Sequence, residues 1–158
     1  MKKIASLTLA LCLACPLSAQ TIANMKDLTA GQKAAATSVK LTGTLTTKGN
    51  SDIRQLRDLC WQLKHVDLST ANCPTLPANA FHSRHRLVSV VLPTNLKSIG
   101  TQAFFACDAL KQLTLPTTLE EVGAAAFSGC SSLESITIEG APRLGGFAFR
   151  GCNNLRSI

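Results

Sequence analysis

Aromatic side chains are scarce in this sequence, which contains no Tyr, one Trp and six Phe among 158 residues. Few rings are therefore available to stack on nucleic-acid bases or on sugars. Most of the Phe residues recur at a regular spacing, and the other hydrophobic residues are mainly aliphatic. This composition indicates that the rings serve the fold and do not form a binding platform.

The residue patterns of common catalytic and metal sites are missing as well. The sequence has no GxSxG, P-loop or GxGxxG motif, and its carboxylates are scattered. The histidines His65, His82 and His85 are expected on the outer strand surface and in a turn, so no His–Cys catalytic pair is expected. A zinc site needs about four ligands, and "HSRH" offers two. We predict no catalytic residue, metal ligand or cofactor, and no enzymatic activity.

The only long apolar run lies at the N-terminus, in "MKKIASLTLALCLACPLSAQ". Two lysines precede the run, and small residues follow it as far as Ala19. This order is typical of a secretory signal peptide, and we predict one over 1–19. The protein is therefore expected to be secreted or attached at the cell surface.

Two alternatives for this segment remain open. A lipoprotein signal would use Cys15, although Cys12 stands where such signals usually carry Leu. A membrane helix is the other alternative, but the run is short for one. Cleavage after Ala19 leaves no other transmembrane candidate and lowers the formal charge from +7 to +5. Because this charge is spread along the chain, and "HSRHR" at 82–86 is typical of a solvated turn, no nucleic-acid partner is predicted.

The sequence repeats itself with a period of 23 residues, with one 22-residue step near the end. Leu-Pro, Ile/Val-Gly, Ala-Phe and Leu-x-x-Leu positions return together in successive units. The Ala-Phe pairs begin at Ala80, Ala103, Ala126 and Ala148. Such a period is a signature of stacked repeats, in which each coil covers the apolar edge of its neighbour.

One unit shows how a coil is built. In "LKQLTLP", residues 110–116, Leu113 and Leu115 alternate with a polar residue, as in a short half-buried strand. Pro116 is expected to end this strand because it cannot donate to a ladder. Either Gly123 or Gly129 is expected to take a positive φ in the following turn.

The unit "LPTTLEEVGAAAFSGCSSLESIT" resembles the BspA-type (treponemal-class) leucine-rich repeat of secreted bacterial surface proteins. The resemblance covers residues 63–158 and departs where Arg84 replaces the Cys and Glu139 replaces a Pro. It implies an α/β fold: a solenoid of about four units, with short parallel strands on one face and short helices or irregular turns on the other. It also implies an adhesion role, through binding of a host or neighbouring-cell surface or matrix protein.

Residues 20–62 do not repeat and are predicted to cap the solenoid. We expect a helix over 27–37, a strand over 38–45, a polar loop over 43–51 and a second helix over 51–63. Asn50 or Ser51 can cap the second helix. The inner stripe of this helix is expected to consist of Ile53, Leu56, Leu59 and Cys60.

Cys107, Cys130 and Cys152 recur with the repeat. In-register side chains point the same way, which does not suit a disulfide, and a free Cys packs as a small hydrophobe. We therefore predict a ladder of reduced, buried thiols. Cys60 and Cys73 could form a disulfide in an exported protein, but Cys60 also fits the inner stripe of its helix, and both readings stay open.

A solenoid presents the outward residues of adjacent strands as one continuous face. This face is predicted to be small, polar and suited to hydrogen bonding with a protein ligand. An alternative is a structural module or a remnant of a larger surface protein with no ligand, and an enzyme acting on envelope polymers is a weaker one. The predicted binding face consists of His65, Asp67, Ser89, Val91, Gln112, Thr114, Ser135 and Thr137.

The sequence ends at "NNLRSI", inside an expected strand. An open edge with unpaired backbone groups favours association. We expect a truncated gene product or the front part of a longer protein, with self-association through this edge.

Overall fold

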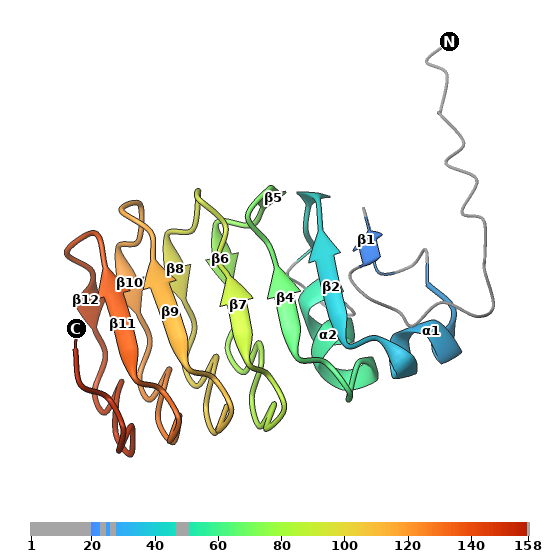
Figure 1. Cartoon of the computed structure of the whole chain (residues 1–158). Coiled ribbons are helices and arrows are strands. Elements are labelled where there is room, and N and C mark those ends of the chain that lie inside the picture. The colour runs from blue at the N-terminus through green and yellow to red at the C-terminus, as the bar shows by residue number, and fades with distance from the viewer. Residues whose placement is uncertain (1–19, 23–24, 26–27, 47–50, 158) are drawn as a thin grey trace, which may run out of the picture.

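The computed structural model describes residues 20–22, 25, 28–46 and 51–157. The predicted signal peptide over 1–19 lies outside the described residues. The chain forms a parallel-strand solenoid, with coils stacked side by side along one axis (Figure 1). The predicted leucine-rich repeat fold is therefore confirmed.

The larger sheet has six parallel strands in the order β1-β2-β4-β7-β9-β11. Each coil of the repeat contributes one strand, because every 23 residues an alternating apolar stretch returns to the same face. The strands are β1 (Gln20–Ile22), β2 (Ser38–Leu41), β4 (His65–Asp67), β7 (Ser89–Val91), β9 (Gln112–Leu115) and β11 (Ser135–Ile138). As predicted, β9 has alternating burial and ends immediately before Pro116.

The opposite face carries a second parallel sheet, which the sequence analysis did not anticipate. It has four two-residue strands in the order β12-β10-β8-β6, and β3 pairs with β5 beside it. Turns without helix complete each described coil of the repeats. The short strands are β3 (Gly43–Thr44), β5 (Ala71–Asn72), β6 (Thr75–Leu76), β8 (Ser98–Ile99), β10 (Glu121–Val122) and β12 (Arg143–Leu144).

Stacked Phe rings form the centre of the core between the two sheets. Successive ring centroids are 5.3 Å apart from Phe81 to Phe104, 5.3 Å from Phe104 to Phe127, and 5.4 Å from Phe127 to Phe149. The first three side chains are fully buried, whereas Phe149 in the last described coil is half-buried. The period of the sequence thus becomes a continuous aromatic ladder, because equivalent residues meet across each coil boundary.

The two glycines of one repeat unit, Gly123 and Gly129, have different roles in the structure. Gly129 takes a positive φ of 77°, which glycine adopts without steric cost. Gly123 does not take a positive φ; instead, a Cβ at this position would lie 2.5 Å from the backbone nitrogen of Thr101. Glycine at 123 therefore allows close contact between adjacent coils.

The cap contains both described helices, α1 (Ala30–Ala35) and α2 (Asp52–Leu59). Ser51 caps α2 by accepting a hydrogen bond from the backbone of Arg54 at 3.1 Å. The inner stripe was predicted correctly except for Leu59, which is 43 % exposed because the helix ends there. The polar loop expected over 43–51 begins with strand β3, and residues 47–50 of this loop lie outside the described part of the chain.

Buried polar groups hold the elements of the cap together. The Asp52 carboxylate accepts hydrogen bonds from the backbone of Met25 at 3.2 Å and from the backbone and hydroxyl of Thr46 at 3.0 and 2.9 Å. Lys33 donates to Gln55 at 2.9 Å and links α1 to α2.

No helix within the described part of the chain has the length and apolar character needed to cross a membrane.

Candidate functional site

The predicted binding face lies on the outer side of the six-stranded sheet. The register aligns His65, Ser89, Gln112 and Ser135 in one row across four strands. A second row follows two residues later along each strand, since side chains alternate with period two. It consists of Asp67, Val91, Thr114 and Thr137.

The β4 side of this face is occupied by internal interactions. Lys40, which the sequence analysis did not include, donates to Asp67 at 2.8 Å. Burial alone would raise the pKa of the Asp67 carboxyl, but hydrogen bonds from Lys40 and Ser69 outweigh it and lower the pKa. In the other row, the His65 ring and the Ser89 hydroxyl also pair, with Nδ1 and Oγ 2.8 Å apart. These side chains therefore have hydrogen-bond partners before any ligand arrives.

The β9–β11 side of the face is different. Gln112, Thr114 and Thr137 are exposed and Ser135 is partly exposed. Within the part of the chain that the structure describes, no side-chain hydrogen bond is formed by any of these four residues. Amides and hydroxyls both donate and accept hydrogen bonds, so this half of the face offers both functions to a ligand.

The sheet opens between β7 and β9. Their register pairs a single position, Ser89 with Gln112, whereas β4 and β7 pair at three positions and β9 and β11 at four. A hollow of about 370 Å³ lies along this opening. Val91, 50 % exposed, lines it, and the sequence analysis had no signal for an opening because the repeat is regular here.

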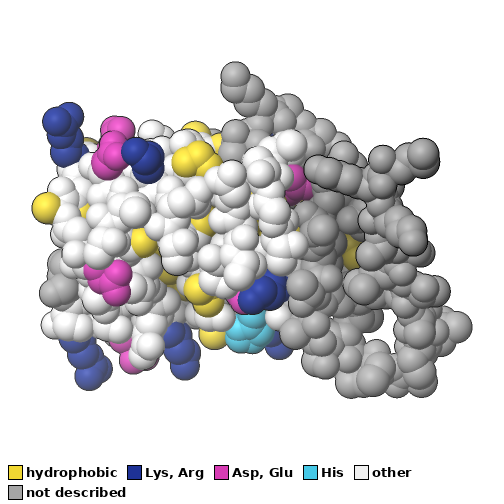
Figure 2. Space-filling view, turned by 90° about the horizontal axis from the view of Figure 1, so that it is seen from above, with side chains coloured by type: hydrophobic (Ala, Val, Ile, Leu, Met, Phe, Trp, Pro, Cys, Tyr) yellow, Lys and Arg dark blue, Asp and Glu magenta, His cyan; other side chains and the backbone are white. Residues whose placement is uncertain are grey.

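Charged groups are sparse around the repeats. The view along the strands shows a mainly uncharged surface, with basic and acidic side chains scattered near its margins (Figure 2). A phosphate backbone is bound by clustered Lys and Arg side chains, and the eight residues of the predicted binding face include no Lys or Arg. The surface is suited to a largely neutral ligand.

The three recurring cysteines lie inside the coils and away from the face. Cys107 and Cys130 are fully buried and Cys152 is partly exposed. Each thiol donates at 3.1 Å to a Phe carbonyl of the preceding coil. Burial raises all three pKa values, that of Cys107 to about 12. Because the thiolate is the nucleophile, these groups are suited to packing and not to catalysis.

The disulfide alternative is not formed. Cys60 and Cys73 are both free and buried. Burial raises the pKa of Cys60 to about 11, and the positive charges of Lys33 and Arg84 oppose this rise. Cys60 therefore belongs to the inner stripe of α2, as one of the two readings had it.

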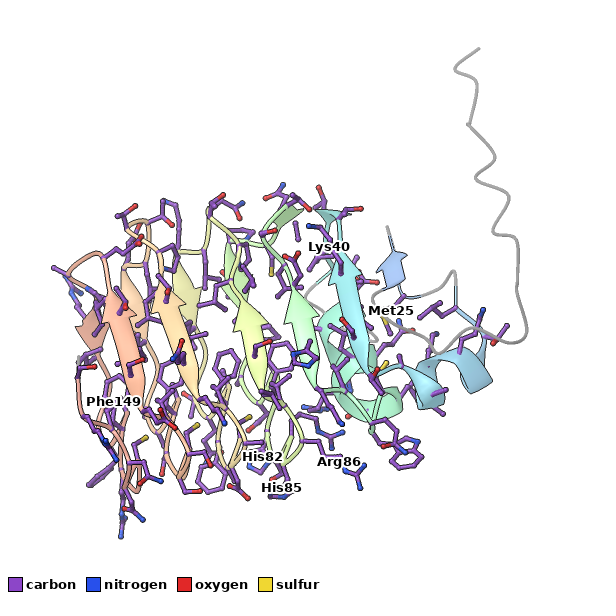
Figure 3. All side chains as sticks on the ribbon, in the orientation of Figure 1. Met25, Lys40, His82, His85, Arg86 and Phe149 are labelled. Carbon is purple, nitrogen blue, oxygen red and sulfur yellow. The ribbon has the colours of Figure 1, made fainter. Side chains whose placement is uncertain are left out.

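Two of the three histidines lie together at the turn edge of the solenoid. Figure 3 shows His82, His85 and Arg86 near one another at this edge and far from Lys40. His85 Nδ1 is 2.7 Å from an Asp108 oxygen, and the His82 ring stacks on Phe105. Among the described residues, no group of three His, Cys, Asp or Glu side chains could hold a metal ion.

Comparisons with known proteins agree with this architecture. The family model of the BspA type leucine rich repeat region matches residues 58–158 in six copies. A crystal structure of a leucine-rich repeat protein from Bacteroides ovatus is 26 % identical, with a TM-score of 0.56, and covers 87 % of this chain. The leucine rich repeat protein of T. pallidum is 21 % identical over 78 % of this chain, with a TM-score of 0.48. This chain spans 36 % and 66 % of their respective lengths. No curated protein matches the sequence.

Proposed function

We propose that this chain, which belongs to the BspA-type leucine-rich repeat family, is an exported module that binds a protein ligand at the cell surface. Members of this family are protein-interaction or repeat modules and are typically not enzymes. The finer role is adhesion, with a surface or matrix protein of a host or a neighbouring cell as the ligand. The N-terminal segment supports export because it has the layout of a secretory signal.

One observation carries this proposal: the face has a half whose polar side chains are free to bind. Gln112, Thr114 and Thr137 stand exposed on parallel strands and have no hydrogen-bond partner among the described residues. Loss of rotamer freedom on binding is small for the short side chains of Thr114 and Thr137. An extended protein segment could therefore bind here through several side-chain hydrogen bonds.

The test is a pull-down of the mature chain against candidate surface and matrix proteins. The triple variant Gln112→Lys, Thr114→Lys and Thr137→Lys places three positive charges on the face. Because all three side chains are exposed, the variant should keep its fold and lose the captured protein. Circular dichroism and thermal unfolding would establish that it is folded.

A charge-matched control uses Thr101→Lys, Ala124→Lys and Asn153→Lys, which are exposed on turns outside the six-stranded sheet. This variant should retain the captured protein. Retention by the folded face variant would contradict the proposal. Capture of no protein by the unmodified chain would favour the structural module without a ligand.

A further inference from the structure

We propose that the hollow between β7 and β9 is an anchor site for one aliphatic side chain of the bound segment, next to a Lys or Arg of the same segment. This inference rests on the proposed function and names the chemistry of the ligand. The opening of the sheet and the hollow coincide, since both lie beyond the single paired position, Ser89 with Gln112.

The walls of the hollow favour an apolar group. Among the described side chains of the six-stranded sheet, Val91 is the most exposed large hydrophobic residue, at 50 %. Val90, Leu92 and Leu113 also line the hollow, although each is buried. A volume of about 370 Å³ lies at the lower end of the range for ligand pockets, ~300–1,000 Å³. It suits one side chain with its flanking backbone and not a large cofactor.

The rim of the hollow adds polar groups of two kinds. Gln112 and Thr114 lie on the strand side and can hydrogen-bond the backbone of a bound segment. Glu139, which directly follows β11, also lines the hollow, whereas the equivalent positions of earlier units, Pro93 and Pro116, have no charge. Glu139 is exposed, and the described residues supply no ion pair to it. A Lys or Arg next to the aliphatic residue would supply that partner.

Labelled peptides test this chemistry directly on the full mature chain. Three fluorescent nonapeptides share Ser/Thr-rich flanks and differ in a central pair: Leu-Lys, Leu-Glu or Ser-Lys. Fluorescence anisotropy should give the lowest Kd for Leu-Lys. The Kd should rise about tenfold for Ser-Lys, because the buried aliphatic group is lost, and several-fold for Leu-Glu, because the charge is reversed.

Two single variants separate the two contributions. Val91→Thr has nearly the same shape but a hydroxyl in place of a methyl, and it should raise the Kd for Leu-Lys several-fold while leaving Ser-Lys unchanged. Glu139→Gln should remove the preference for Leu-Lys over Leu-Glu. Glu121→Gln, an exposed change on the second sheet, is the matched control and should leave every Kd unchanged.

The inference would be overturned by equal binding of the three peptides, by no binding of any peptide, or by an unchanged preference in Glu139→Gln. These failures are distinguishable from failure of the proposed function. If the triple Lys variant loses its captured protein while the peptides bind without preference, only the anchor site is wrong. If that variant keeps its captured protein, the binding face itself is wrong.

Discussion

The cap and the repeat coils are held together by different kinds of interaction. Of the five buried polar or charged residues in the described chain, four lie in the cap and one, Ser128, lies in the repeats. The cap depends on individual hydrogen bonds, such as those of Asp52 to Met25 and Thr46. The repeats depend on ladders of equivalent side chains, of which the stacked Phe rings are the largest.

This difference shows why one region repeats in sequence and the other does not. A coil between two similar coils needs the same apolar residue at each position, because each neighbour presents the same surface. A cap has one neighbour and must satisfy its remaining polar groups with specific partners, and an unpaired buried group is expensive. Arg84 marks the boundary: it stands where later coils have Cys, and its charge lies near Cys60 of the cap.

The largest effect is expected from breaking the Phe ladder at its centre. Phe104 is fully buried and stacks on Phe81 and Phe127. Phe104→Ala removes both contacts and leaves a cavity, so the free energy of unfolding should fall by about 3–5 kcal/mol. Urea unfolding followed by circular dichroism measures this loss.

Phe147→Ala is the control for the same change at an exposed site. Phe147 is 72 % exposed, and its truncation should alter stability by less than about 0.5 kcal/mol. A comparable loss in both variants would show that the ladder does not dominate the stability of the coils.

The equivalent change in the cap is Asp52→Ala. It removes the acceptor of three hydrogen bonds and leaves the amide of the buried Met25 unpaired, together with the amide of Thr46, which is exposed. The free energy of unfolding should fall by about 3 kcal/mol, and hydrogen exchange should quicken in β2 while β9 keeps its protection. Asp58→Ala, at an exposed ion pair with Arg57, should cost no more than about 1 kcal/mol. Uniform loss of protection along the chain would contradict a separately stabilised cap.

The sequence predicted the repeats better than the surface features between them. Leu113 and Leu115 set the strand and Pro116 ended it, because burial and strand termination follow from local residue types. The second sheet was missed, since its two-residue strands are too short to show alternation. The hollow at Val91 was missed because it depends on how two strands diverge, and that is not encoded in the period.

Within the face, the sequence analysis grouped the outward residues but did not show which of them are already hydrogen-bonded. His65, Asp67 and Ser89 were grouped with Gln112 and Thr114 because all five point outward. The hydrogen-bond partners of His65, Asp67 and Ser89 come from neighbouring strands. Lys40, for example, lies 27 positions from Asp67 in the sequence. Only the register shows which of these groups are already paired.

The buried thiols of the repeats should make the free energy of unfolding depend on pH. Burial raises the pKa of Cys107 from 9.0 to about 12, so the folded state keeps a proton that the unfolded state loses. The stabilisation is complete below about pH 9 and is lost as pH rises toward 12. Between pH 8 and pH 10, the free energy of unfolding should fall by about 1.4 kcal/mol for this thiol. Cys107→Ala should show a correspondingly smaller fall in urea unfolding at the two pH values, and an equal fall in both proteins would contradict the assignment.

The smallest effect concerns the turn conformation that the coils share. Ala106 has a φ of 53°, and the equivalent positions hold Gly129 at 77° and Gly151 at 75°. The left-handed region costs an L-residue about 1–2 kcal/mol, and glycine offsets part of the gain through its greater freedom in the unfolded chain, about 0.5–1 kcal/mol. Ala106→Gly should therefore raise the free energy of unfolding by about 0.5–1 kcal/mol.

The reverse exchange, Gly129→Ala, should lower the free energy of unfolding by a similar amount. The nearest atoms to the added Cβ are 3.5 Å away, so the positive φ, and not a steric clash, decides the sign of the change. Urea titrations of the two variants give the change in the free energy of unfolding. Changes of opposite sign would show that the turn is equivalent in successive coils, and changes of equal sign would show that the two turns differ.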